Sequence, residues 1–95
     1  METIYSDESI DVFLEEVEEI EKGVFIHTNV KQFSLSTFKK FKHIFLNICE
    51  IVKDRDIQYL LAIPPSNKEQ KWQECFGFTY TGILVNKQKL MRIYL

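Results

Sequence analysis

Cysteine is scarce in this sequence of 95 residues, and its two cysteines, Cys49 and Cys75, lie far apart without a Cys-x-x-Cys pattern. A small secreted domain is usually held together by four or more cysteines, so no disulfide framework is expected. The two histidines are also scattered and give no cluster of metal ligands. We therefore predict two buried thiols in a reducing compartment and no metal site.

Long apolar runs and glycine-rich motifs are missing as well. No segment approaches the roughly 18 apolar residues of a membrane span. The acidic start of the chain lacks the apolar core of a signal peptide. Neither a P-loop nor a Gly-x-Gly-x-x-Gly motif occurs, so the common nucleotide-binding loops are not expected. These observations predict a protein of the cytoplasm.

Charge is distributed unevenly along the chain, although the net charge is only −2. Residues 1–22 contain nine acidic residues and one lysine, whereas residues 23–95 contain eleven basic and five acidic residues. Such asymmetry marks either an interaction surface or the solvated side of a packed element. A chain of this length forms one domain, which we expect to span residues 1–95.

The spacing of apolar residues near the start predicts an acidic helix within residues 1–22. Asp7 or Ser9 would cap its beginning, and Gly23 would end it. The apolar residues lie at i, i+3, i+4, i+7 and i+10, which is one helical stripe: Ile10, Phe13, Leu14, Val17 and Ile20.

The remaining residues, 23–95, alternate between strand and helix patterns. Strands are expected at 24–30, 57–63, 78–85 and 89–95, with helices at about 37–53 and 67–76. Strands joined by helices favour parallel pairing, and the last two strands favour an antiparallel hairpin. The predicted class is α/β (α+β), a mixed sheet in the order helix-strand-helix-strand-helix-strand-strand.

The segment Leu61-Ala-Ile-Pro-Pro-Ser-Asn67, followed by a short helix and Cys75-Phe-Gly-Phe78, resembles part of a known family. It is similar to the C-terminal half of the GNAT superfamily of N-acyltransferases, in which a central strand enters a Pro-x-Asn loop and a helix closed by Gly-Phe. The resemblance covers about residues 23–95. It extends to small GNAT-like proteins carried by bacteriophages, and it implies a GNAT-like sheet.

The sequence departs from the family pattern where the cofactor would bind. The family places a Q/R-x-x-G-x-G/A motif before a helix, so that backbone amides close on the pyrophosphate of acetyl-CoA. Here the matching stretch is Lys31-Gln-Phe-Ser-Leu-Ser36, with serines in place of both glycines. Lys31, Ser34 and Ser36 could still hold a phosphate at the helix N-terminus, but ordinary N-capping explains the two serines with fewer assumptions.

The catalytic residues of the family are also not matched. Many members carry a tyrosine four residues before the glycine of Gly-Phe, where this chain has Gln73. Glutamine cannot act as a general acid. His27, His43 and the glutamates of the first helix are the candidate bases, and none has a sequence neighbour that would tune its pKa. No catalytic residue is therefore assigned.

We expect a non-catalytic GNAT-like module that binds a protein partner or associates with itself. The resemblance implies a protein of a phage or mobile element, either a virion component or an inhibitor of a host protein in the host cytoplasm. No cofactor is expected. The candidate partner-binding residues come from the acidic helix and the C-terminal strands: Glu15, Glu16, Glu19, Tyr80 and Tyr94.

Three alternatives remain open from the sequence. The first is a minimal N-acetyltransferase that uses acetyl-CoA or CoA through Lys31, Ser34 and Ser36. The second is a folded module unrelated to acyltransferases. The third is nucleic-acid binding by the lysines and phenylalanines of residues 31–42, which the acidic composition and the helical spacing of Phe38 and Phe41 disfavour.

Overall fold

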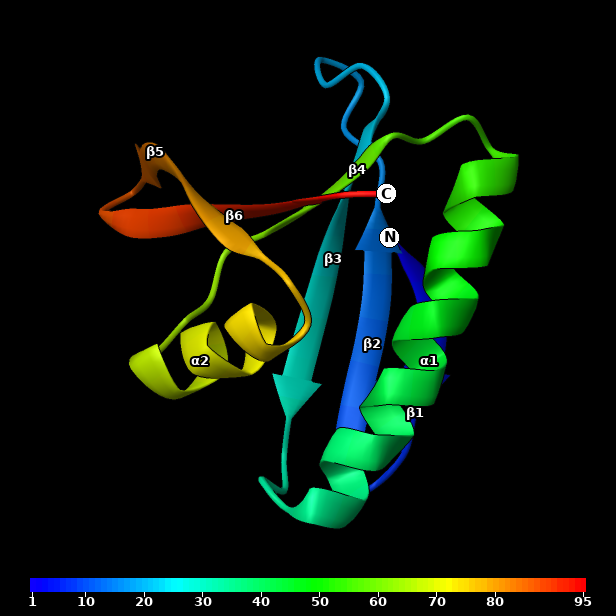
Figure 1. Ribbon diagram of the computed structural model, residues 1–95, viewed down its shortest axis with the longest axis vertical. Helices are drawn as coiled ribbons and strands as arrows, with labels where there is room; N and C mark the ends of the chain where they lie inside the picture. The colour runs from blue at the N-terminus through cyan, green and yellow to red at the C-terminus, as the bar shows by residue number, and fades with distance from the viewer.

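The computed structural model describes all 95 residues, as one six-stranded sheet and two helices (Figure 1). The strand order in the sheet is β1-β2-β3-β4-β6-β5, and only the β3–β4 pair is parallel. The elements follow along the chain as β1 (Glu2–Ser6), β2 (Ile10–Glu15), β3 (Gly23–Val30), α1 (Leu35–Asp54), β4 (Tyr59–Ala62), α2 (Asn67–Cys75), β5 (Thr79–Val85) and β6 (Gln88–Tyr94).

The prediction of a helix within residues 1–22 is wrong. These residues form the antiparallel strands β1 and β2 and a turn that leads into β3. Ile10, Val12 and Leu14 are buried while the residues between them are only half-buried, which is the two-residue period of a strand. β2 pairs with β3 along its whole length, so tertiary pairing overrides the helical spacing of the apolar residues.

From Gly23 onward the chain follows the expected sequence of strand, helix, strand, helix and two strands. Ser34 and Ser66 are the N-caps, and their hydroxyls accept hydrogen bonds from the backbone amides of Thr37 and Glu69. The turn between β5 and β6 has positive φ angles at Asn86 and Lys87, as a tight two-residue hairpin turn requires.

Both helices pack on the same face of the sheet and against each other (Figure 1). Phe38 of α1 meets Trp72 of α2 edge to face, with ring centroids 5.3 Å apart. Phe41 meets Phe76, at the end of α2, in the same way at 4.9 Å. The buried apolar residues of β2, β3, β4 and β6 complete this core beneath the helices.

The opposite face of the sheet carries no helix. Leu61 is only 5% exposed, yet it lies outside the core cluster, and Phe13 and Phe25 do not pack against that cluster. The register of the strands places these three residues away from the helices. We call this surface the helix-free face, and its residues are Phe13, Glu15, Phe25, His27, Tyr59, Leu61, Arg92 and Tyr94.

Gly23 allows a side chain to lie close to the backbone on the helix-free face. A Cβ atom at Gly23 would overlap the ring of Tyr59 and would lie 2.9 Å from Cγ2 of Ile20. The Tyr59 hydroxyl donates a 2.9 Å hydrogen bond to the carbonyl of Glu21, which holds the ring in place. Gly23 is therefore required by this contact and not by the end of a helix.

Gly23→Ala is expected to lower the free energy of unfolding by about 1–3 kcal/mol, because the added methyl group overlaps the Tyr59 ring. Urea unfolding of the purified protein measures this loss. The same substitution should cost clearly less in a Tyr59→Ala background, where the ring is removed. Equal losses in both backgrounds would show that the contact with Tyr59 is not the reason for the glycine.

Candidate functional site

A cavity opens where β3 and β4 separate. The two strands pair over only three residues, from Gly23 opposite Tyr59 to Phe25 opposite Leu61, and β3 then continues alone to Val30. The cavity measures about 340 Å³. It is lined by β3, the segment after β4, α2 and the start of β6: Ile26, His27, Thr28, Ile63, Pro65, Gln73 and Gln88.

His27 is the only titratable side chain that lines this cavity. Its Nε2 atom lies 2.8 Å from Oε1 of Glu15 on the neighbouring strand, and its ring stacks on Phe25 with centroids 5.9 Å apart. A carboxylate that accepts a proton from one imidazole nitrogen leaves the other nitrogen free to accept one. The pair therefore has the form of an oriented base, which sequence reasoning missed because it placed Glu15 on a helix.

Gln73 lines the same cavity from α2. It is 8% exposed, and its Oε1 atom has no hydrogen-bond partner in the protein. The amide can accept and donate hydrogen bonds but cannot release a proton as a general acid. The cavity thus offers one imidazole that is oriented by Glu15 and one hydrogen-bonding amide.

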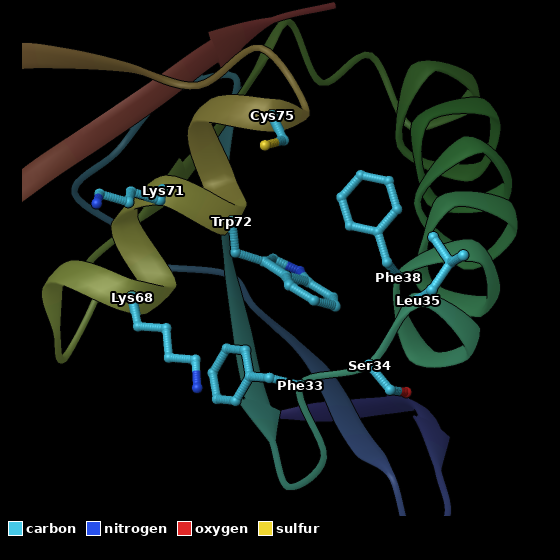
Figure 2. A pocket seen from close by; sticks show the side chains of 8 residues that line it. All are labelled: Phe33, Ser34, Leu35, Phe38, Lys68, Lys71, Trp72 and Cys75. Atoms are coloured by element: carbon cyan, nitrogen blue, oxygen red, sulfur yellow. The ribbon is translucent and has the colours of Figure 1, made fainter.

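A second hollow, about 450 Å³, lies between the start of α1 and α2 (Figure 2). Its walls are aromatic: Phe33 and Trp72 meet edge to face at 5.7 Å. Lys68 reaches from α2 to within 4.3 Å of the centre of the Phe33 ring, and Lys71 lines the same side. The hollow therefore combines an apolar floor with a basic rim.

The three residues predicted to hold a cofactor phosphate are not gathered at this hollow. The Nζ atom of Lys31 lies 3.1 Å from Oδ1 of Asp11 and donates a 2.8 Å hydrogen bond to the carbonyl of Asp7. Ser34 lines the hollow, but its hydroxyl accepts the 3.1 Å bond from the Thr37 amide that caps α1. Ser36 is exposed in the first turn. Lys31 and Ser34 are thus already engaged within the protein.

Two of the predicted partner-binding residues, Glu15 and Tyr94, share the helix-free face. Tyr94 is 66% exposed, its ring meets that of Tyr59 at 6.0 Å, and the Arg92 guanidinium lies 4.6 Å from its centre. Glu15 lies on the same face, beside His27 on β3. Tyr94 and Glu15 therefore lie on one surface with the aromatic residues Phe13, Phe25 and Tyr59.

The other three predicted partner-binding residues lie elsewhere. Tyr80 pairs with the buried Met91, so its position in β5 belongs to the helix side of the sheet. Glu16 lies 3.9 Å from Arg55 at the end of α1, and Glu19 is exposed in the turn before β3. The five residues therefore do not form one surface.

Asp7 organises the polar contacts beside the start of α1. Its carboxylate accepts hydrogen bonds from Lys40 at 2.6 Å, from the Tyr5 hydroxyl at 2.6 Å and from the Ser9 hydroxyl at 2.7 Å. The bond from Lys40, followed by those from Tyr5 and Ser9, holds the pKa of Asp7 far below its usual value. This network ties the β1–β2 turn to α1.

No protein family and no curated protein matches this chain. The side chains contain no group of three or more histidines, cysteines, aspartates or glutamates arranged to bind a metal ion. Neither helix has the length and apolar character that crossing a membrane requires.

Asp7→Asn is expected to destabilise the protein at neutral pH and to flatten its pH dependence. A carboxyl group whose folded pKa is lowered stabilises the fold above its unfolded pKa of about 3.9, and the stabilisation is lost as the pH falls. The wild type should therefore lose stability between about pH 4 and pH 2 more steeply than the variant. Urea midpoints across this range measure the difference, and Glu18→Gln, on an exposed turn, is the control.

Proposed function

We propose that the chain is a non-catalytic protein-binding module and that its helix-free face is the binding surface. The sequence of the two central strands supports this. β3 contains the consecutive apolar residues 24–26 and β4 contains residues 60–62. Consecutive apolar residues are typical of parallel strands that are covered on both faces, whereas the helices of this chain cover only one. A second polypeptide would supply the missing cover.

The chemistry of the helix-free face also suits a protein partner. Tyrosine and arginine are enriched at the energetic centres of interfaces, and here Tyr59, Arg92 and Tyr94 lie side by side. Phe13 and Phe25 are half-buried on the same face, so a partner would complete their burial. On such a surface the apolar rings would contribute binding affinity, and the charges beside them would contribute specificity for the partner.

The two hollows support a non-catalytic role. Many members of the family that the sequence resembles carry a tyrosine at the position of Gln73, which lines the cavity beside β3 and cannot release a proton. At the start of α1, Lys31 and Ser34 are bonded within the protein instead of facing an open phosphate site. A phosphate would have to displace the Asp11 carboxylate from Lys31, at the cost of an existing ion pair.

The biological setting follows from the sequence resemblance alone. The sequence resembles small GNAT-like proteins of bacteriophages, and on that resemblance the module would act in a host cytoplasm, as a virion component or as an inhibitor of a host protein. Both roles require a folded binding surface, and neither requires catalytic activity.

A photoreactive side chain on the helix-free face tests this function. p-Benzoylphenylalanine in place of Tyr94 or Phe13, in protein expressed in its natural source, is expected to give one discrete adduct with a polypeptide after irradiation. Mass spectrometry identifies the attached chain and the site. An adduct is expected because a partner docked on the helix-free face would lie within reach of the photoreactive group at both positions.

The matched control is the same substitution at Leu46, which is 55% exposed on α1. Adducts at Tyr94 and Phe13 but not at Leu46 support the proposal. Adducts at none of the three positions, or equally at all of them, would count against a specific surface. Thermal unfolding of each variant establishes that the fold is intact.

A second candidate function, a minimal acetyl-CoA-dependent N-acetyltransferase, is favoured by one observation, the His27–Glu15 pair at the cavity. An amine nitrogen would bond to the thioester carbonyl carbon, the carbon–sulfur bond would break, and His27 would take the proton of the amine. Close positioning of the two reactants can supply much of the rate of such a reaction. The departing thiolate would leave without a protein acid.

Titration calorimetry with acetyl-CoA and with CoA, in phosphate-free buffer, separates the two functions. We expect no binding heat at high micromolar ligand, because Lys31 and Ser34 are already bonded. Micromolar binding with a matching rise in melting temperature would instead favour the transferase. In that case Ser34→Phe with Ser36→Phe should abolish binding, and His27→Ala should slow acetyl transfer while leaving binding in place.

A further inference from the structure

We infer that the occupant of the helix-free face is a second copy of this chain, so that the protein is a symmetric dimer. The inference rests on the proposed function, because it names the partner of the same surface. It comes from the way charged and apolar residues are ordered across that face.

Four residues form one row across the strands of the helix-free face. The register places Glu15 of β2 beside Phe25 of β3, Phe25 beside Leu61 of β4, and Leu61 beside Arg92 of β6. We call this the charged row. It has an acid at one end, a base at the other and two apolar residues between them.

The two charges of this row are too far apart to pair within one chain. Neighbouring strands are about 4.8 Å apart, so three strand spacings separate Glu15 and Arg92 by roughly 14 Å. Glu15 contacts His27, whereas Arg92 takes part in no ion pair and lies over the ring of Tyr94. The row therefore offers a cation that lacks an acidic partner in its own chain.

A twofold axis satisfies both ends of the charged row at once. If the axis runs along the line where β3 and β4 pair and passes between these two strands, Glu15 of one copy lies opposite Arg92 of the other. The same operation places Phe25 above Leu61, which is only 5% exposed in the single chain, so Phe25 supplies the new apolar contact. In such a self-complementary interface every contact occurs twice.

The size of the molecule is sufficient for a dimer of this type. Its two longer dimensions are 34 and 31 Å, and it is 21 Å through its shortest. A stable specific interface buries about 800 Å² of each partner, which a surface of this breadth can provide. Burying Phe13, Phe25 and Tyr94 would contribute most of the apolar part.

The edges of the sheet are less suited to pairing with another copy. β5 bulges between Tyr80 and Leu84, and within the bulge the Thr81 hydroxyl accepts the Ile83 amide hydrogen at 3.1 Å. β1 has an irregular register between Thr3 and Tyr5. Bulges of this kind protect edge strands from sheet extension. The face, and not an edge, is therefore the surface for self-association.

Charge reversal with restoration tests the dimer. Sedimentation equilibrium over a wide concentration range is expected to show monomer and dimer in exchange for the wild type. Arg92→Glu and Glu15→Arg should each weaken dimerisation about tenfold or more, since each places like charges together twice. The double variant carrying both changes should regain an affinity within about threefold of the wild type, because opposite charges face each other again.

The control exchanges two exposed charges on α1, Lys42→Glu with Glu50→Arg, and should leave dimerisation unchanged. A monomer at every concentration would overturn the second-copy inference, as would a dimer that neither single reversal weakens. If the chain is monomeric but Tyr94 still forms an adduct with a different polypeptide, the binding function stands and only the identity of the partner is wrong. If neither a dimer nor an adduct is found, both fail.

Discussion

Three residue pairs between β3 and β4 join the two halves of this sheet, and the rest of the structure depends on that short parallel contact. Strands β1–β3 with α1 form one half, and β4, α2, β5 and β6 form the other. Because this contact consists of so few backbone pairs, the two halves need further packing to stay together. The rings of Phe41 and Phe76 provide it where the helices meet above the sheet. The cavity beside His27 exists because the strands separate immediately after these pairs.

The same constraint explains why one face of the sheet is left free. Both helices are needed on one side, where they clamp the two halves through an aromatic cluster. With only two helices in the chain, none remains for the opposite side. Consecutive apolar residues in β3 and β4 nevertheless suit cover on both faces. The arrangement therefore combines a stable core with a surface suited to a partner.

Most of the fold after residue 23 could be predicted, because caps, turns and apolar periods agree there. The N-terminal strands could not, since Ile10, Phe13, Leu14 and Val17 fit a helical stripe while Ile10, Val12 and Leu14 fit a strand equally well. Pairing with β3 decides between the two periods, and that contact is not visible in the local sequence.

For the candidate site, the sequence identified individual residues but not the partners that they contact in the fold. The phosphate role of Lys31 and Ser34 rests on their match to the family's Q/R-x-x-G-x-G/A motif before a helix, whereas the structure gives them Asp11 and Thr37 as partners. The partnership of His27 with Glu15 depends on the β2–β3 pairing. It could not be predicted while Glu15 was placed on a helix, whereas a strand assignment for β2 would have brought the two residues together.

In the folded protein, several acidic residues at the start of the chain form ion pairs with basic residues that come later in the sequence. Glu2 contacts Arg55 at 3.0 Å, and Asp7 contacts Lys40 at 2.6 Å. Much of the charge asymmetry is thus neutralised within the fold and does not mark a surface for a foreign cation. What remains on the helix-free face is Arg92, a cation without an acidic partner. Glu15 lies at the other end of the same row. In the proposed dimer, the Glu15 carboxylate of the second copy therefore becomes the acidic partner that Arg92 lacks in its own chain.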